Sequence, residues 1–562
     1  MKPFPFRGIE MGFGFGEKVL VILHRLPVLD HSVNLLVVIA LCVGHKRFLT
    51  TRGAFGDWRI WSPNAPAHFK VYVNSFLRNF FLQSLEDEIK KRNRDRAEIR
   101  ALKSFRDCST IRMEEELALN TAGNSALAEY DQELFRQYDL FFIDTSYGTD
   151  HARTEKIGDH VMNYANKNLE NTKLFESKMI CADIQEVELA TDNGGEVLKQ
   201  QIIDYEKNYF GIEALEQLFS DYKWSETEEI GEEELIQKRD ENADKLSKEK
   251  PPVRTVEKER YHEESGEMEI YEEKEEVSIE DPAAYVNELR KRGILSLVVD
   301  DTSKISGKAI RPEEYVSHRS DLLQGTGLLQ ERKKEISFLG KSEEKILLNA
   351  YIFQKYGYYG RAKENGALEY QVEYLLGNKG SDIENLRVVV RKLVLLREAA
   401  NAVYLYGDVT KKAEISAMAA SVSAVTLAPY LQPLLETSIL FAWAYIESIQ
   451  DVKLLLDGGK VPILKTVSDW QTDLDSILNF AGASVSREET QGLTYQQYLS
   501  VLLLAEQDKE LLPPMMDVME MDIRKTIYHE NFRMDGCASG FRIAAEFEDS
   551  SGNCSFLRSY YY

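Results

Sequence analysis

Three residue types of a hydrolytic triad occur within eight positions in the segment DTSYGTDH, residues 144–151. Asp144, Ser146 and His151 have the chemistry of an orienting acid, a nucleophile and a general base. The members of such a triad usually come from separate elements, which lets the base reach the nucleophile while an oxyanion site faces it. On one short loop, Asp and Ser side chains more simply bond nearby amides, and Gly148 relieves a strained backbone. We expect a structural turn without catalytic residues, and hydrolysis through this loop is the alternative.

Other short motifs lack the spacing that their chemistry requires. GFGFGEK (12–18) has neither dinucleotide-binding spacing nor a preceding strand. LLLDGGKVP (454–462) lacks the first glycine and the closing Ser or Thr of a phosphate-binding loop. His262 and His529 precede glutamates but lack the second histidine of a zinc-hydrolase pair. We therefore expect no cofactor and no metal ion.

The cysteines are few, odd in number and widely scattered: Cys42, Cys108, Cys181, Cys537 and Cys554. Their spacing fits no zinc site. We expect free, buried thiols, and a disulfide between the last two, which flank part of a C-terminal hairpin, is the alternative.

Composition describes a folded but strongly acidic chain. The 562 residues are 43% hydrophobic and carry a net charge of −24. A nucleic-acid-binding protein would show a basic face, so the charge argues against that class. Half of the charge lies in residues 226–280, with 21 acids against 9 bases. We interpret this block as a solvated insertion with short strands at VRTVEKERY and EMEIYEEK, and calcium binding is the alternative.

Periodicity predicts an α+β fold, with a predominantly helical body and a small mixed β-sheet that includes a C-terminal hairpin. Expected helices span 96–138, 197–222, 342–356, 382–406, 410–426, 429–456, 494–508 and 513–530, and expected strands span 140–144, 179–191 and 294–299. In the first helix, Tyr130, Phe135 and Tyr138 are expected to pack it against the body. With Asp144, Ser146, Tyr147 and Gly148 they form our set of structural or interaction candidates.

The domain organisation follows from these patterns. We expect an atypical N-terminal region (1–95), a helix with the first part of the α+β body (96–225), a poorly ordered acidic insertion (226–281), and a helix-rich body (282–562). In the first region, VNLLVVIALCVG (33–44) is too short to cross a bilayer, which needs about 20 apolar residues. We interpret residues 1–95 as a start or reading-frame artefact rather than a lost anchor.

A series of segments also follows one fixed order. They are ALAEYDQELFRQYDLFFIDTSYGT (126–149), GILSLVV (293–299), LLQGTG (322–327), LLNAYIFQKYGYYG (347–360), LEYQVEYLLGNKGSDIENLRVVVRKLVLLREAANAVYL (368–405), GGKVPILKTVSDWQTDL (458–474), GLTYQQYLSVLLL (492–504) and ENFRMDGC (530–537). Together they resemble the bacterial domain of unknown function 5702 family over residues 110–562. Members are typical of Gram-positive bacteria and resemble Flp/Tad pilus-locus proteins, with one N-terminal transmembrane helix and a large domain outside the cytoplasm. No catalytic residues are assigned in the family.

The resemblance implies a non-enzymatic, envelope-associated protein, a pseudopilin-like accessory or assembly component of a Tad/Flp-type pilus or secretion system. Its expected partners are other proteins of that apparatus, and nucleic acid is not among them. One departure concerns the membrane: RNRDRAEIRALKSFRDCST (92–110), where the family has its helix, is strongly charged. A soluble intracellular interaction protein is therefore one alternative. A hydrolase that uses residues 144–151 is the other.

Overall fold

The computed structural model describes residues 96–172, 176–223, 232–249, 253–261, 268–276, 281–335, 340–425, 428–480, 491–549 and 552–562. The interpretation of residues 1–95 lies outside this set. The chain divides into two compact units. Of the described residues, unit 1 comprises 96–121, 164–172, 176–180, 546–549 and 552–556, and unit 2 comprises the rest.

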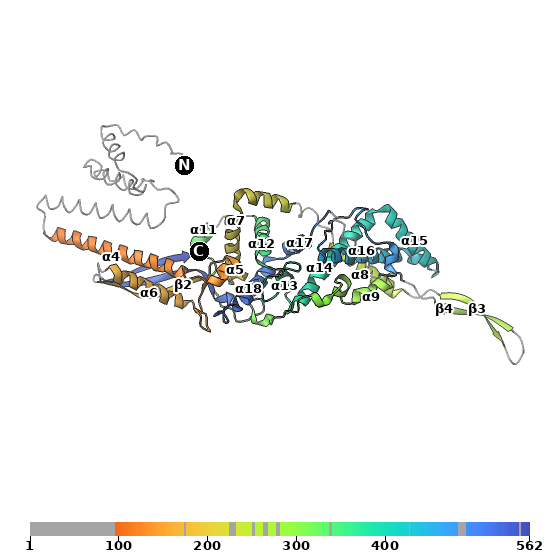
Figure 1. Cartoon of the computed structure of the whole chain (residues 1–562), viewed down its shortest axis with the longest axis horizontal. Coiled ribbons are helices and arrows are strands. Elements are labelled where there is room, and N and C mark those ends of the chain that lie inside the picture. Colours follow the sequence, from red (N-terminus) through yellow and green to blue (C-terminus); the bar gives the residue numbers. More distant parts are fainter. Residues whose placement is uncertain are drawn as a thin grey trace, which may run out of the picture. The chain divides into compact units, whose positions relative to one another are not determined.

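Helices form most of the described chain, and two small antiparallel sheets accompany them, which confirms the predicted α+β class (Figure 1). The helices are α4 (Arg96–Leu127), α5 (Gln132–Tyr138), α6 (Glu155–Thr172), α7 (Glu196–Lys223), α8 (Glu232–Lys248), α9 (Ala284–Lys291), α10 (Leu295–Val298), α11 (Gln330–Glu335), α12 (Lys341–Lys355), α13 (Gln371–Gly377), α14 (Asp382–Gly407), α15 (Val409–Val425), α16 (Gln432–Leu456), α17 (Tyr495–Ala505) and α18 (Asp508–Arg524). The strands are β1 (Ile143–Asp144), β2 (Ser177–Leu189), β3 (Val253–Tyr261), β4 (Met268–Glu276), β5 (Cys537–Asp549) and β6 (Gly552–Tyr561).

The larger sheet joins strands from both ends of the described chain. Its order is β1-β5-β2, and β6 pairs with β5 as the predicted C-terminal hairpin. Ile143 lies opposite Ala538, and Asp144 lies opposite Cys537. Cys181, Cys537 and Cys554 are free thiols, as expected, although of these three only Cys537 is buried; Cys181 is exposed and Cys554 is half-buried.

Unit 1 contains the start of β2 and parts of α4 and α6. The side-chain amide of Asn166 on α6 makes two hydrogen bonds with the backbone of Met179. It accepts from the Met179 amide at 2.8 Å and donates to the Met179 carbonyl at 3.2 Å. The side chain thereby satisfies a strand edge much as a neighbouring strand would. On α4, Glu115 is buried and accepts a hydrogen bond from the Ser177 hydroxyl at 2.6 Å. Burial raises the pKa of Glu115.

The core of unit 2 is built around α14 and α16. Leu386, Val389 and Leu393 form the buried apolar stripe that their spacing predicted for α14. Helix α16 is buried on nearly all sides, which agrees with its predicted place in a core. Among the helices that the structure describes, none has an apolar stretch long enough to cross a bilayer.

Three predicted elements differ from the observed ones. Residues 294–299 do not form a buried strand, because Leu295–Val298 is the short helix α10; a short apolar run does not distinguish the two by periodicity. Helix α18 begins at Asp508 rather than Pro513, and acids in its first turn mark this start. The helix predicted over 96–138 is interrupted after Leu127, and Asp131 caps α5 by accepting from the Leu134 amide at 2.7 Å.

Candidate functional site

The DTSYG loop forms the predicted turn. The Ser146 hydroxyl donates to Asp144 Oδ2 at 2.6 Å, and the Ser146 amide donates to Asp144 Oδ1 at 2.9 Å. The Gly148 amide donates to Ser146 Oγ at 3.2 Å. Tyr147 and Gly148 have positive φ angles of 49° and 74°. The Ser146 hydroxyl is thus engaged within its own turn, and His151 is exposed.

Neighbouring side chains hold this turn in place. The Tyr147 hydroxyl donates to Glu129 Oε2 at 3.3 Å, and its ring lies 4.1 Å from that of His160. His160 Nδ1 lies 2.9 Å from Glu129 Oε2. Lys156 Nζ donates to the Ser146 carbonyl at 2.7 Å. Burial raises the pKa of Asp144, against the opposing effect of its bonds with Ser146.

Within unit 2, the three aromatic candidates pack around α5 and its flanks. Tyr130 makes edge-on contacts with Phe135 and Phe141, with ring centroids 5.4 Å and 5.1 Å apart. Tyr138 is fully buried and donates to Asp522 Oδ2 at 2.8 Å. The sequence candidates therefore make structural contacts in two places, the turn and the core around α5.

Buried acids on α18 hold separate parts of unit 2. Asp517, Glu520 and Asp522 are each at most 3% exposed. They accept hydrogen bonds from the backbone amides of Ser317 (2.9 Å), Met534 (3.0 Å) and Ala367 (2.7 Å), in that order. Sequence reasoning missed these residues, although acids spaced along an apolar segment such as DVMEMD are a usable signal for buried anchors.

A second buried charge cluster joins α14, α16 and the loop before α17. Lys465 lies between Glu447, with which it forms a close ion pair, and Asp451 Oδ1, at 2.6 Å. Arg397 Nε donates to Asp451 Oδ2 at 3.0 Å. The Thr472 amide donates to Glu447 Oε2 at 2.9 Å. These charges are therefore engaged with one another inside the body.

Helix α8, within the acidic insertion, is anchored to this body by one buried carboxylate. Arg239 Nη1 of α8 lies 3.0 Å from Glu398 Oε2 of α14, and Arg290 Nη2 of α9 lies 2.6 Å from Glu398 Oε1. Glu398 is 2% exposed. Asn242 of α8 donates to the Leu434 carbonyl at 3.0 Å. Helix α8 therefore has specific contacts with the body.

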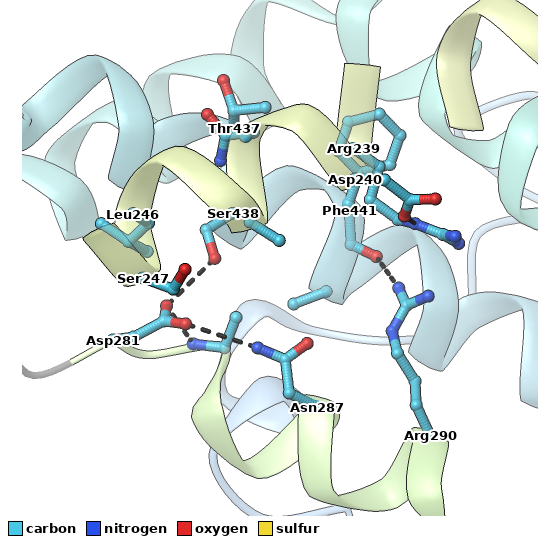
Figure 2. A pocket seen from close by; sticks show the side chains of 14 residues that line it. Arg239, Asp240, Leu246, Ser247, Asp281, Asn287, Arg290, Thr437, Ser438 and Phe441 are labelled. Carbon is cyan, nitrogen blue, oxygen red and sulfur yellow. Dashed lines mark hydrogen bonds and ion pairs between the residues drawn. The ribbon is translucent and has the colours of Figure 1, made fainter. Parts of the chain in front are cut away.

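A cavity of about 410 Å³ lies at this joint, between α8, α9 and α16 (Figure 2). Asp281 and Arg290 lie at opposite ends of it. Asp281 Oδ1 accepts from the Ser438 hydroxyl and the Ala283 amide, both at 3.0 Å. Burial raises the pKa of Asp281, while these bonds oppose the rise. At each end of the cavity the polar side chains are already hydrogen-bonded to neighbouring residues, Asp281 to Ser438 and Arg290 to the Phe441 carbonyl, as in a joint between helices.

Strands β3 and β4, which follow α8, form a separate two-stranded hairpin (Figure 1). Its register is continuous from Val253 opposite Glu276 to Tyr261 opposite Met268. The two predicted strands are thereby confirmed. Most of the described side chains of this hairpin are exposed. The hairpin makes no extended contact with any other helix or strand that the structure describes.

The register assigns the side chains of the hairpin to two faces, since directly opposed residues share a face and successive residues alternate. One face carries Val253, Thr255, Glu257, Glu259, Met268, Ile270, Glu272, Lys274 and Glu276, and we name it the acidic face. The other carries Arg254, Val256, Lys258, Arg260, Tyr271, Glu273 and Glu275, and we name it the paired face.

Comparison with known protein families gives one match, which begins in the hairpin and extends through most of the body. Residues 272–549 match a family of unknown function, DUF5702. Over this range the chain belongs to the DUF5702 family. No curated protein and no solved structure shows a match. The DUF5702 range includes both α14 and α16, and it begins within β4.

Proposed function

We propose that this DUF5702 protein is a non-enzymatic, envelope-associated accessory or assembly component of a Tad/Flp-type pilus or secretion system. In this proposal it contacts other proteins of the apparatus through the β3–β4 hairpin. The observation that carries the proposal is the hairpin itself, an exposed two-stranded arm that follows a helix anchored by Glu398.

The physical argument concerns stability. A two-stranded hairpin alone is at best marginally stable in water, because neither face is covered and each outer edge leaves backbone groups unpaired. Binding to a partner would cover apolar side chains such as Ile270, which is 63% exposed. An assembly component needs such a surface, held by a rigid body.

Deletion in the producing bacterium tests the proposal. Residues 253–276 are replaced by a short Gly-Ser linker, and the variant is compared with the intact chain. We expect unchanged abundance and thermal unfolding midpoint, with loss of pilus assembly or secretion and of co-purification with its proteins. Normal assembly with the variant would contradict the proposal.

Cell fractionation tests the location. The proposal predicts that the protein sediments with the envelope fraction. Recovery from the cytosol, with partner binding still dependent on the hairpin, would favour a soluble intracellular interaction protein instead.

A further inference from the structure

The two faces of the hairpin differ in how their charges are satisfied. On the paired face, Lys258 Nζ lies 2.8 Å from Glu273 Oε2 and 2.6 Å from Glu275 Oε1. These hydrogen bonds raise the pKa of Lys258 and lower that of Glu275. Arg260 lies over the ring of Tyr271, 6.0 Å from its centroid. The charges of this face are thus largely satisfied within the hairpin.

The acidic face has the opposite arrangement. Glu257 lies directly opposite Glu272 in the ladder. Like charges in directly opposed positions repel each other and destabilise a strand pair. Glu259 and Glu276 lie on the same face, and Lys274 is its one base among the described residues. No ion pair reaches these four glutamates within the described part of the chain.

Apolar side chains share this face with the unpaired acids. Val253 and Met268 are each 56% exposed, and Ile270 is 63% exposed. Val253 lies opposite Glu276, and Ile270 lies opposite Glu259. Apolar and acidic side chains therefore alternate across one solvent-exposed surface. Acids alone would keep an exposed hairpin soluble, but they would not require uncovered apolar neighbours.

We infer that the acidic face docks a partner segment in which Lys or Arg side chains flank apolar ones. A basic side chain placed between Glu257 and Glu272 would replace their repulsion with two attractions. The apolar side chains of that segment would cover Val253 and Ile270. This inference rests on the proposed function in one respect, that the hairpin is the contact arm.

Charge also selects against other occupants. A second copy of the acidic face would bring like charges together, and so would anionic lipid or nucleic acid. The net charge of −24 on the whole chain favours encounter with basic partners over acidic ones.

Peptide binding to the full-length protein tests the inference. The probe is a short fluorescent peptide that alternates arginine and isoleucine, and anisotropy measures its Kd. The test variant is Glu257→Gln/Glu272→Gln, and the matched control on the other face is Glu273→Gln/Glu275→Gln. The test variant removes a repulsion, so loss of hairpin folding does not explain a loss of binding.

We expect the test variant to weaken binding about fivefold or more, and the control to change it less than about twofold. Ile270→Ser should weaken this peptide but not one that alternates arginine and serine. Equal weakening by both double variants would overturn the inference, since it would show attraction to net charge alone. Preferential binding to phosphatidylglycerol vesicles would also overturn it.

The two proposals fail differently. If hairpin deletion stops assembly but the two faces bind the peptide alike, the contact arm stands and the acidic-face inference falls. If the faces differ as expected but deletion leaves assembly intact, the acidic face still recognises basic segments, and the role in assembly falls.

Discussion

Lys465 and Lys258 each bridge two carboxylates, but they do so in contrasting regions of the protein. The Lys465 side chain is 1% exposed, between Glu447 and Asp451 in the body. The Lys258 side chain is 41% exposed, between Glu273 and Glu275 on the hairpin. A buried charge that loses its partner is costly, whereas water solvates an exposed one. In the body, ion pairs hold the structure together, whereas on the paired face of the hairpin water can replace a lost ion-pair partner.

Replacing each lysine by methionine in turn should give the largest difference in stability between the two regions. Lys465→Met leaves Glu447 and Asp451 buried without their shared cation, and we expect a loss of about 3–5 kcal/mol in the free energy of unfolding. Lys258→Met should leave the urea midpoint unchanged. Equal shifts for the two variants in urea denaturation would contradict the contrast.

Glu373, a buried acid that has no cationic partner among the described residues, sharpens the comparison because its protonation depends on pH. Burial raises the pKa of Glu373 to about 7, although the Tyr359 amide and Tyr495 hydroxyl donate to it at 2.8 Å and 2.7 Å. A raised carboxyl pKa favours the protonated folded state. Its stabilising contribution is therefore present below the unfolded pKa, near 4.5, and is lost as pH rises through about 7.

Glu373→Gln should remove this titration while keeping an oxygen for both donors. We expect the variant to gain about 3 kcal/mol relative to the wild type between pH 5 and pH 8. Burial also raises the pKa of Glu206 to about 7, so part of the wild-type slope should remain. Urea denaturation across this pH range measures both slopes, and identical slopes would show that Glu373 does not titrate there.

The ion pair between Arg239 and Glu398 allows a test of how firmly α8 is attached to the body. Arg239→Ala leaves Glu398 paired with Arg290 alone. We expect a local loss of about 1–2 kcal/mol, seen as faster hydrogen exchange in residues 237–249 with little change in α14. Unchanged exchange in α8 would show that other contacts hold it.

The smallest of these stability effects concerns the turn at Ser146. Ser146→Ala removes the hydroxyl bonds to Asp144 and the Gly148 amide, and we expect a loss of about 1 kcal/mol in thermal or urea unfolding. Should the protein show hydrolytic activity that this variant abolishes without unfolding, the structural account of the turn would be wrong.

Local sequence patterns predicted the elements of the body better than its contacts. The stripe of α14 and the buried run of α16 have strong helical spacing, so both helices were predicted closely. Helix α8 was missed because its sequence is polar, and its anchor, Glu398, lies 159 residues from Arg239. Such a contact leaves no local periodic signal.

The candidate surface was only partly predictable for the same reason. Alternation in VRTVEKERY and EMEIYEEK predicted two strands, but the opposition of Glu257 and Glu272 depends on their register. The acidic composition predicted a solvated block, and the division of its charge between two faces became visible only with the hairpin. The DTSYG turn was predictable because its bonds join residues close in sequence.

Photo-cross-linking from each face of the hairpin, carried out in the producing cell, tests the central claim most directly. A photoreactive amino acid is placed at Thr255, on the acidic face, or at Val256, on the other face. We predict a specific adduct from position 255 alone, whose cross-linked segment contains Lys or Arg beside apolar residues and belongs to a pilus or secretion protein. Equal adducts from both positions, or an adduct from position 256 alone, would contradict the account.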